Sequence, residues 1–199
     1  KNIIILKSTM VPGTTNNFAK QFPKLNIVFN PEFLTERTAK LDFLTQARIV
    51  LGGPKRLTKR VAKLFEERFM HCYIIETDAI TSEMIKYMNN VFFASKVSIM
   101  NEMKMMCDAI GANWKQALKG FAADQRIGDS HLNVPGPDGR MGFGGSCFPK
   151  DINAFMSYAD ELGVDIPTIK GAWETNLNVR PERDWEKLEG RAVVKKAKK

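Results

Sequence analysis

The sequence has few of the residues that build disulfide frameworks or metal centres. It contains three cysteines, Cys72, Cys107 and Cys147, and two histidines, His71 and His131. An odd number of cysteines with no C-x-x-C pair predicts neither a disulfide framework nor a zinc site. No group of His, Cys and carboxylate residues has the spacing of metal ligands. We therefore expect no metal, and reduced thiols of the kind found in cytoplasmic proteins.

Long hydrophobic runs and internal repeats are also absent. No stretch is long and apolar enough to span a bilayer, and the segment NIIIL at residues 2–6 lacks the length and cleavage site of a signal peptide. Hydrophobic residues still make up 44% of the 199 residues, which is enough for a buried core. These features predict a soluble, folded protein that has no membrane partner.

The net charge of +8 is concentrated near the end of the chain. Basic residues crowd the last positions, at Lys187, Arg191, Lys195, Lys196, Lys198 and Lys199. Charge runs of this kind are usually solvated, so we predict a basic tail over residues 190–199 and no nucleic-acid partner. A small molecule that bears phosphate stays open as a partner.

The first part of the chain alternates between strand and helix patterns. Short apolar, β-branched runs predict strands at residues 2–8, 25–32, 48–53 and 72–77, and a helical pattern fills residues 54–70. The turn VPGTT opens another helix after the first strand. This order predicts an α/β fold with part of a doubly wound, Rossmann-like parallel sheet over residues 1–77, and ligands at the carboxyl ends of its strands.

From residue 78 onward the pattern is helical. Asp78 or Thr81 is placed to cap one long helix that ends near Ile110, and its apolar residues cover more than one stripe. We expect this helix to be buried on several sides, with a second copy of the chain as a natural cover. Shorter helices are predicted at residues 113–123, 149–162 and 168–188, with a loop at 124–146, so residues 78–189 form an all-helical domain.

The loop leads into the segment GFGGSCFPKD at residues 142–151, which raises the question of an active cysteine. A proline two residues after Cys147 suits the first turn of a helix, so free amides and Lys150 would favour the thiolate form of this cysteine. Gly142, Gly144 and Gly145 would leave room for a substrate. The alternative is a small buried cysteine beside an ordinary glycine turn. The segment is no dinucleotide fingerprint, since G-x-G-x-x-G needs glycine where Cys147 stands.

Five motifs in order carry a resemblance to a known family. KSTMVPGTT, NPEFLTERTA, TSEMIKYMNN, DQRIGDSHLNVPGPDGRMGFGG and GFGGSCFPKD resemble the UDP-glucose/GDP-mannose dehydrogenase family over about residues 1–190. The resemblance implies an NAD-dependent, two-step oxidation of a nucleotide sugar, with UDP-glucose as first choice. Cys147 would add to an aldehyde and become a thioester that water releases.

The resemblance also implies roles for other positions. The catalytic residues would be Cys147, Lys86, Glu32, Asn90, Asp151 and Thr9. The cofactor would be NAD, near Ser8, Thr9, Glu36 and Lys150. The substrate would contact Phe33, Leu34, Lys86, Asn90, Arg126, Gly142, Phe143 and Gly144.

Elementary chemistry supports some of these roles and offers plainer ones. Lys86 and Asn90 share one helix face and would hold an oxyanion, although a helix lysine commonly faces solvent. Glu32 follows a strand end as a general acid/base, or as a surface carboxylate. Thr9 would help to place the hydrolytic water, or only bond the turn. Asp151 would partner Lys86 and the water, or complement the helix dipole.

Two departures from the family keep other hypotheses open. No G-x-G-x-x-G turn precedes Lys1, and no second nucleotide-binding domain follows, so we expect that a piece is missing at the front. One alternative is a noncatalytic relative that binds nucleotide sugars or dimerises, and another is a dehydrogenase for a sugar such as GDP-mannose. Arg126 resembles an arginine that reaches the neighbouring subunit's substrate, which implies a homodimer through the long helix.

Overall fold

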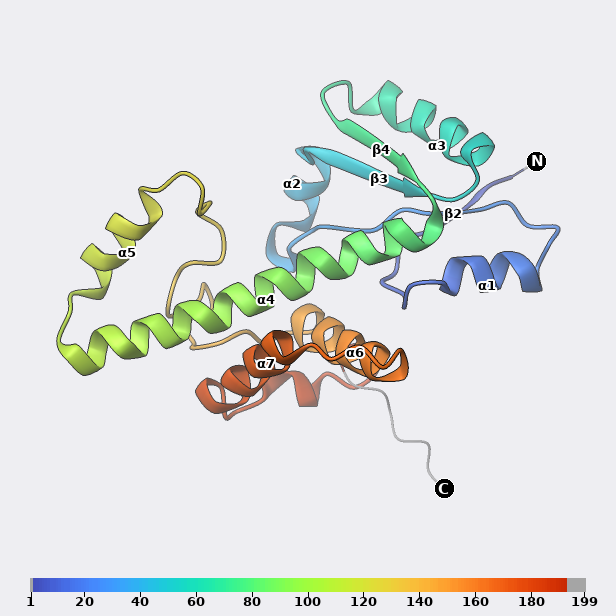
Figure 1. Ribbon diagram of the computed structural model, residues 1–199. Coiled ribbons are helices and arrows are strands. Elements are labelled where there is room, and N and C mark those ends of the chain that lie inside the picture. The colour runs from blue at the N-terminus through green and yellow to red at the C-terminus, as the bar shows by residue number, and fades with distance from the viewer. Residues whose placement is uncertain (1, 193–199) are drawn as a thin grey trace. The chain divides into compact units, whose positions relative to one another are not determined.

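The computed structural model describes residues 2–192, which form two compact units that divide between residues 88 and 89. Helix α4 (Ala79–Ile110) contributes residues to both units (Figure 1). The basic tail that we predict over residues 190–199 lies outside the described residues from residue 193 onward.

The first unit is built on a four-stranded sheet in the order β1-β2-β3-β4. The strands are β1 (Ile4–Leu6), β2 (Ile27–Phe29), β3 (Arg48–Gly52) and β4 (Tyr73–Thr77). β1 pairs with β2 in parallel, as does β3 with β4, whereas β2 and β3 are antiparallel. The expected α/β fold with a parallel-rich sheet is confirmed, and the expectation that every pairing is parallel is wrong.

The connections explain the one antiparallel pairing. Helix α1 (Thr14–Gln21) joins β1 to β2, and helix α3 (Lys55–Arg68) joins β3 to β4, as parallel crossovers require. Between β2 and β3 the chain forms only the short η1 (Glu36–Thr38) and α2 (Ala39–Leu44). The chain therefore enters β3 from the end of the sheet at which β2 finished.

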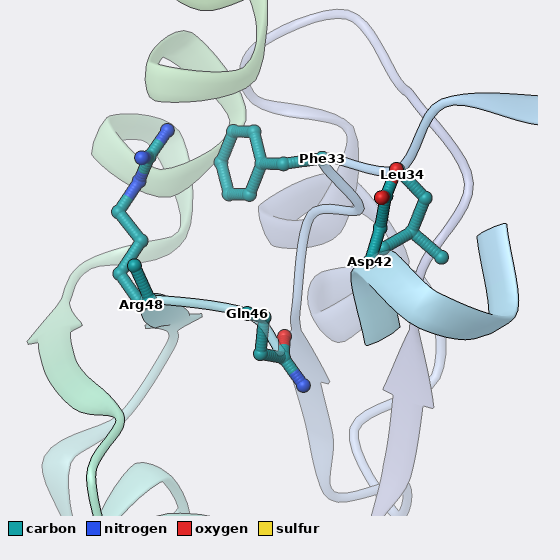
Figure 2. Close-up of a pocket in the computed structure, with 6 residues that line it drawn as sticks. Phe33, Leu34, Asp42, Gln46 and Arg48 are labelled. Atoms are coloured by element: carbon teal, nitrogen blue, oxygen red, sulfur yellow. The ribbon is translucent and has the colours of Figure 1, made fainter. Parts of the chain in front are cut away.

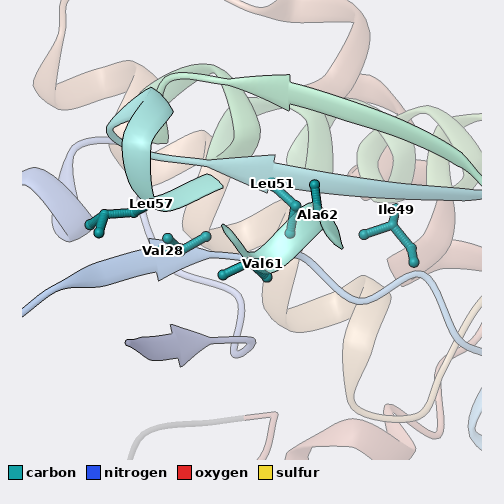
Figure 3. Close-up of a cluster of buried hydrophobic side chains, with 6 residues drawn as sticks. All are labelled: Val28, Ile49, Leu51, Leu57, Val61 and Ala62. Carbon is teal, nitrogen blue, oxygen red and sulfur yellow. The ribbon is translucent and has the colours of Figure 1, made fainter. Parts of the chain in front are cut away.

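The core of this unit lies between the middle strands and α3. The side chains of Val28, Ile49, Leu51, Leu57, Val61 and Ala62 form one buried cluster (Figure 3). Leu57 and Val61 stand four residues apart on α3, so they face the sheet together. The helical pattern predicted at residues 54–70 therefore supplies the expected buried stripe.

The second unit is helical. Besides its part of α4, it contains α5 (Trp114–Ala122), α6 (Cys147–Glu161), α7 (Pro167–Val179) and the short η2 (Asp184–Lys187). Residues 123–146 form neither helix nor strand, as predicted. The prediction of one helix over 168–188 is wrong, because Pro181 disfavours a helical conformation at Arg180, which ends α7 with φ −129° and ψ 66°.

Helix α4 begins as predicted. Asp78 accepts hydrogen bonds from the amide of Thr81, at 2.9 Å, and from its hydroxyl, at 2.6 Å, which caps the first turn. In the second unit, Val91, Ala94 and Met100 of α4 are buried. Other apolar side chains of the same helix stay exposed, so one face is covered rather than several. Among residues 2–192, no helix has the length and apolar character needed to cross a membrane.

Candidate active site

Cys147 is the first residue of α6, two residues earlier than the predicted helix start. Its side chain is exposed, which excludes the alternative of a small buried cysteine. The sulfur lies 3.8 Å from the Ser146 hydroxyl. The first backbone amides of a helix have no acceptor within it, and they carry the positive end of the helix dipole. Cys147 is thus an accessible thiol at a helix terminus that favours negative charge.

Asp151 lies one turn further along α6 and is only 1% exposed. Its carboxylate accepts a hydrogen bond from the side-chain amide of Asn90, at 2.5 Å, and lies 2.8 Å from the Lys150 ammonium. The structure therefore brings Asn90, Asp151 and Lys150 together beside the turn that carries Cys147. Because Asp151 engages the Lys150 ammonium, the charge of Lys150 is shared with a carboxylate rather than directed at the sulfur alone.

Within the first unit, a second group of predicted residues surrounds Lys86. This lysine is 8% exposed, so the alternative of a solvent-facing charge does not hold. Its ammonium donates a hydrogen bond to the backbone carbonyl of Glu32 and lies 5.6 Å from the centre of the Phe33 ring. The Glu32 side chain itself is exposed. The buried ammonium of α4 thus binds the backbone of the residue that follows strand β2 by three positions.

Phe33 and Leu34 line a pocket of about 140 Å³ (Figure 2). Asp42, Gln46, Ala47 and Arg48 complete its lining. The Arg48 guanidinium lies 4.4 Å from the centre of the Phe33 ring, a cation–π contact that fixes the ring's orientation. Sequence reasoning missed Arg48, because nothing in its spacing sets it apart from any other charged residue at the start of a strand.

The residues predicted to meet the cofactor stand mainly after strand β1. Ser8 is exposed and Thr9 is half-buried, and neither hydroxyl has a partner among residues 2–192. β1 and β2 are parallel, so Ser8, Thr9 and Glu32 follow the same edge of the sheet, where open α/β folds bind ligands. Free hydroxyls at this edge fit the polar groups of a dinucleotide. Glu36 lies in η1 and is exposed.

Two of the glycines before Cys147 pack closely against other parts of the chain. A side chain on Gly144 would start 2.4 Å from the Arg180 guanidinium, and one on Gly142 would start 2.5 Å from the Asn176 side chain. Their missing side chains make room for Arg180 and Asn176. Gly145 has φ +69° and no atom within 4 Å of the position of a Cβ, so of Gly142, Gly144 and Gly145 it is the one that leaves open space. Phe143 is buried between them.

Arg126 lies on the surface of the second unit. Its side chain is 89% exposed and pairs with Asp124 at 2.5 Å, which holds the pKa of that carboxyl below its usual value. His131, which we did not single out for a role, stacks on Phe93 with ring centres 4.3 Å apart. Burial, helped by the Lys96 charge, lowers the pKa of His131. No three His, Cys, Asp or Glu side chains in the described part of the chain gather as a metal site would require.

Comparison with known proteins adds independent information. Residues 1–69 match the NAD binding domain, and residues 80–178 the central domain, of the UDP-glucose/GDP-mannose dehydrogenase family. The chain is 37% identical over 190 residues to UDP-glucose 6-dehydrogenase of Rickettsia conorii, covering 94% of this chain and 43% of that protein. The identity to the enzyme of the same name in Rickettsia prowazekii is 41% over 189 residues, covering 90% of this chain and 41% of that protein.

A solved structure agrees with these matches. A UDP-glucose dehydrogenase from Pyrobaculum islandicum superposes with a TM-score of 0.79 at 30% identity, covering 89% of this chain and 41% of that one. The chain thus spans about two fifths of the length of the relatives it matches. Two domains of the same family match consecutive parts of the chain, and the fold agrees with them. The chain therefore belongs to the UDP-glucose/GDP-mannose dehydrogenase family.

Proposed function

We propose that this chain carries the reacting part of an NAD-dependent UDP-glucose 6-dehydrogenase. The observation that carries the proposal is the exposed Cys147 at the start of α6, one turn from a buried Asp151 bound to Asn90. Residues 1–77 would be part of the NAD-binding domain, and residues 78–189 the helical catalytic and dimerisation domain. The names of the relatives support UDP-glucose as the substrate.

The proposed chemistry oxidises a primary alcohol to a carboxylate in two steps. In the first step the alcohol loses a hydride and a proton to give an aldehyde, and Glu32 takes the proton. The Cys147 sulfur then bonds to the aldehyde carbon to form a thiohemiacetal, which loses a second hydride and its hydroxyl proton to give a thioester. Water, placed by Thr9, cleaves the thioester to release the acid and the thiol. Bound NAD would accept the hydride in each oxidation.

Lys86 and Asn90 would hold the oxyanion that forms during these steps. They lie four residues apart on α4, so one continuous helix supports their use in a common reaction. Asp151 would fix the Asn90 side chain through their 2.5 Å hydrogen bond. A cysteine with this role must stay reduced, and this need supports a cytoplasmic location.

One assay tests the proposed function. The chain is incubated with UDP-glucose and NAD, both alone and joined to the regions of the Rickettsia conorii relative that flank the match. We expect two NADH per molecule of sugar from the joined protein. GDP-mannose as the preferred substrate would replace UDP-glucose in the proposal. No NADH from any sugar would support a noncatalytic protein that binds nucleotide sugars.

We also propose that the chain forms a homodimer through α4. Several apolar side chains of this helix are exposed at spacings of seven, four, three and four residues: Phe92, Ile99, Met103, Met106 and Ile110. This spacing places them on one stripe, which is the pattern of a helix that packs against another. The exposure of Arg126 suits its proposed role toward a neighbouring subunit.

A charge on the stripe should dissociate the dimer. We expect Met103→Glu to raise the dissociation constant more than about a hundredfold, because a carboxylate would be buried in an apolar interface. Sedimentation velocity measures the two masses. Met105→Glu is the matched control, since Met105 is equally exposed at 51% but points to another side of the helix. A wild-type monomer, or equal effects of both variants, would contradict the proposal.

A further inference from the structure

Arg180 is a buried cation to which we had given no role. It ends α7, and its side chain is only 2% exposed. Its guanidinium donates to the Asp184 carboxylate at 2.6 Å and to the Asp138 carboxylate at 2.7 Å. A third hydrogen bond, 3.2 Å long, goes to the backbone carbonyl of Met141. Burying a cation is costly unless carboxylates pair with it, so this arrangement is built as a unit.

The partners of Arg180 lie on the loop that leads to Cys147, or bind it. Asp138 and Met141 are residues of the loop itself. Asp184 accepts a hydrogen bond of 3.1 Å from the backbone amide of Gly145, two residues before the cysteine. Burial raises the pKa of Asp184, but the bonds from Arg180 and Gly145 outweigh this effect and leave the pKa below its usual value. The network therefore holds the loop at three points.

Two buried asparagines hold the middle of the same loop. The Asn176 side chain accepts from the amide of Phe143 at 2.7 Å and donates to its carbonyl at 3.0 Å. The Asn101 side chain accepts from the amide of Gly142 at 3.0 Å. The backbone amides and carbonyls of the loop have no partners in a helix or strand. These side chains of α4 and α7 supply hydrogen-bond partners in their place.

The glycine pattern fits this network. A Cβ on Gly144 would lie 2.4 Å from one Arg180 nitrogen and 2.5 Å from an Asp184 oxygen. The loop backbone approaches the guanidinium so closely that only glycine fits at this position. The Arg180 guanidinium and the Gly144 backbone therefore pack directly against each other. Loss of the guanidinium would leave the backbone before Cys147 without this packing.

We infer that Arg180 is a positioning residue, which sets the place of the Cys147 sulfur by clamping residues 138–145 through Asp138, Asp184 and the Met141 carbonyl. It does not contact the sulfur, and it acts on Cys147 through the backbone of the loop. The inference rests on the proposed function only in taking Cys147 as the nucleophile. Without these contacts, the backbone before the first turn of α6 would no longer be held in one conformation. The distance between the sulfur and the first amides of the helix would then vary.

Alkylation by iodoacetamide tests the inference in the full chain, because Cys107 and Cys72 serve as internal references. Cys107 is half-buried on α4, and burial raises the pKa of the Cys72 thiol. In the wild-type chain we expect Cys147 to react first. In Arg180→Gln we expect its rate, relative to that of Cys107, to fall about tenfold, which corresponds to losing a helix-terminus effect. Peptide mass spectrometry follows the three thiols separately.

Matched variants separate positioning from general stability. Arg140→Gln changes an exposed arginine of the same loop, which lies 3.7 Å from Glu182, and should leave the rate ratio unchanged. Arg180→Lys keeps the charge but not the planar fork of donors, so we expect an intermediate ratio. If Arg180→Gln fails to fold, Asp138→Asn tests the inference instead. We expect the labelling rate of Cys147 relative to Cys107 to fall in this variant too, by a smaller factor. Labelling of all three thiols at equally altered rates would indicate unfolding and overturn the inference.

The inference and the proposed function fail in different ways. If Arg180→Gln slows labelling of Cys147 but the wild-type protein forms no NADH, the clamp stands and the dehydrogenase does not. If the wild-type protein forms two NADH per sugar and Arg180→Gln changes neither labelling nor kcat, the clamp fails alone. With both correct, kcat falls about tenfold in Arg180→Gln, a larger factor than any change in KM, because the clamp acts first on the sulfur.

Discussion

In the protein joined to the flanking regions of its relative, Cys147→Ala should abolish the proposed oxidation of UDP-glucose to its acid, with a loss of more than about a thousandfold in the rate of acid production. Without the sulfur no thiohemiacetal forms, so the aldehyde carbon lacks the tetrahedral adduct from which the second hydride would leave. The NADH yield per sugar should therefore fall from two to no more than one. Spectrophotometry at the NADH absorbance, together with chromatography of the sugar product, measures both quantities.

The matched control for this prediction is Cys107→Ala, which removes a half-buried thiol from α4 in the same unit. This variant should keep the yield of two NADH per sugar. Cys147→Ser gives a stricter comparison, since its hydroxyl has the shape of the thiol but is a far weaker nucleophile near neutral pH. If either variant at position 147 still makes the acid at the wild-type rate, covalent catalysis by this residue is wrong.

Glu83→Gln should have the largest effect on the stability of the first unit. Glu83 is fully buried, and one carboxylate oxygen accepts from both the amide and the hydroxyl of Thr15, at 2.8 and 2.6 Å. Its other oxygen accepts from the amide of Gly13 at 2.6 Å. Because glutamine has only one acceptor oxygen, an N–H group would face another N–H group. We expect a loss of about 2–4 kcal/mol in the free energy of unfolding.

Hydrogen exchange followed by mass spectrometry locates this loss. Peptides that contain α1 and the turn before it should exchange faster in Glu83→Gln, because the carboxylate fixes the start of that helix. Glu66→Gln, on the exposed side of α3, should change stability by no more than about 0.5 kcal/mol. Equal exchange in the two variants would show that the buried carboxylate does not hold this turn.

Much of the helical pattern could be read from the sequence. Asp78 and the apolar spacing after it predicted the start of α4, and the structure shows the cap. The proline two residues after Cys147 predicted a helix start there, although α6 begins at the cysteine itself. These features are local, because a cap or a first turn depends on a few neighbouring residues.

The direction of β3 could not be predicted in the same way. An apolar, β-branched strand has the same sequence pattern in either direction, and only the path of residues 30–47 decides how it pairs. The role of Gly144 is a similar case. A glycine three residues before a cysteine suggests space for a ligand, but Arg180, thirty-six residues later, lies where its side chain would be. Asn176 and Arg180 stand four residues apart in the sequence. This spacing was the only sequence feature that hinted at their shared contact with the glycine loop.

The order of its motifs, by itself, determined the family of this protein and the identity of its candidate nucleophile, because motif and local helix signals lie within short stretches of chain. Only the tertiary structure decided that Lys86 and Asp151 are buried and that Asn90 bonds to Asp151. It alone assigned two of the loop glycines to packing against Asn176 and Arg180. The physical reason is that burial and hydrogen bonding join residues dozens of positions apart, and no local pattern records which of them meet.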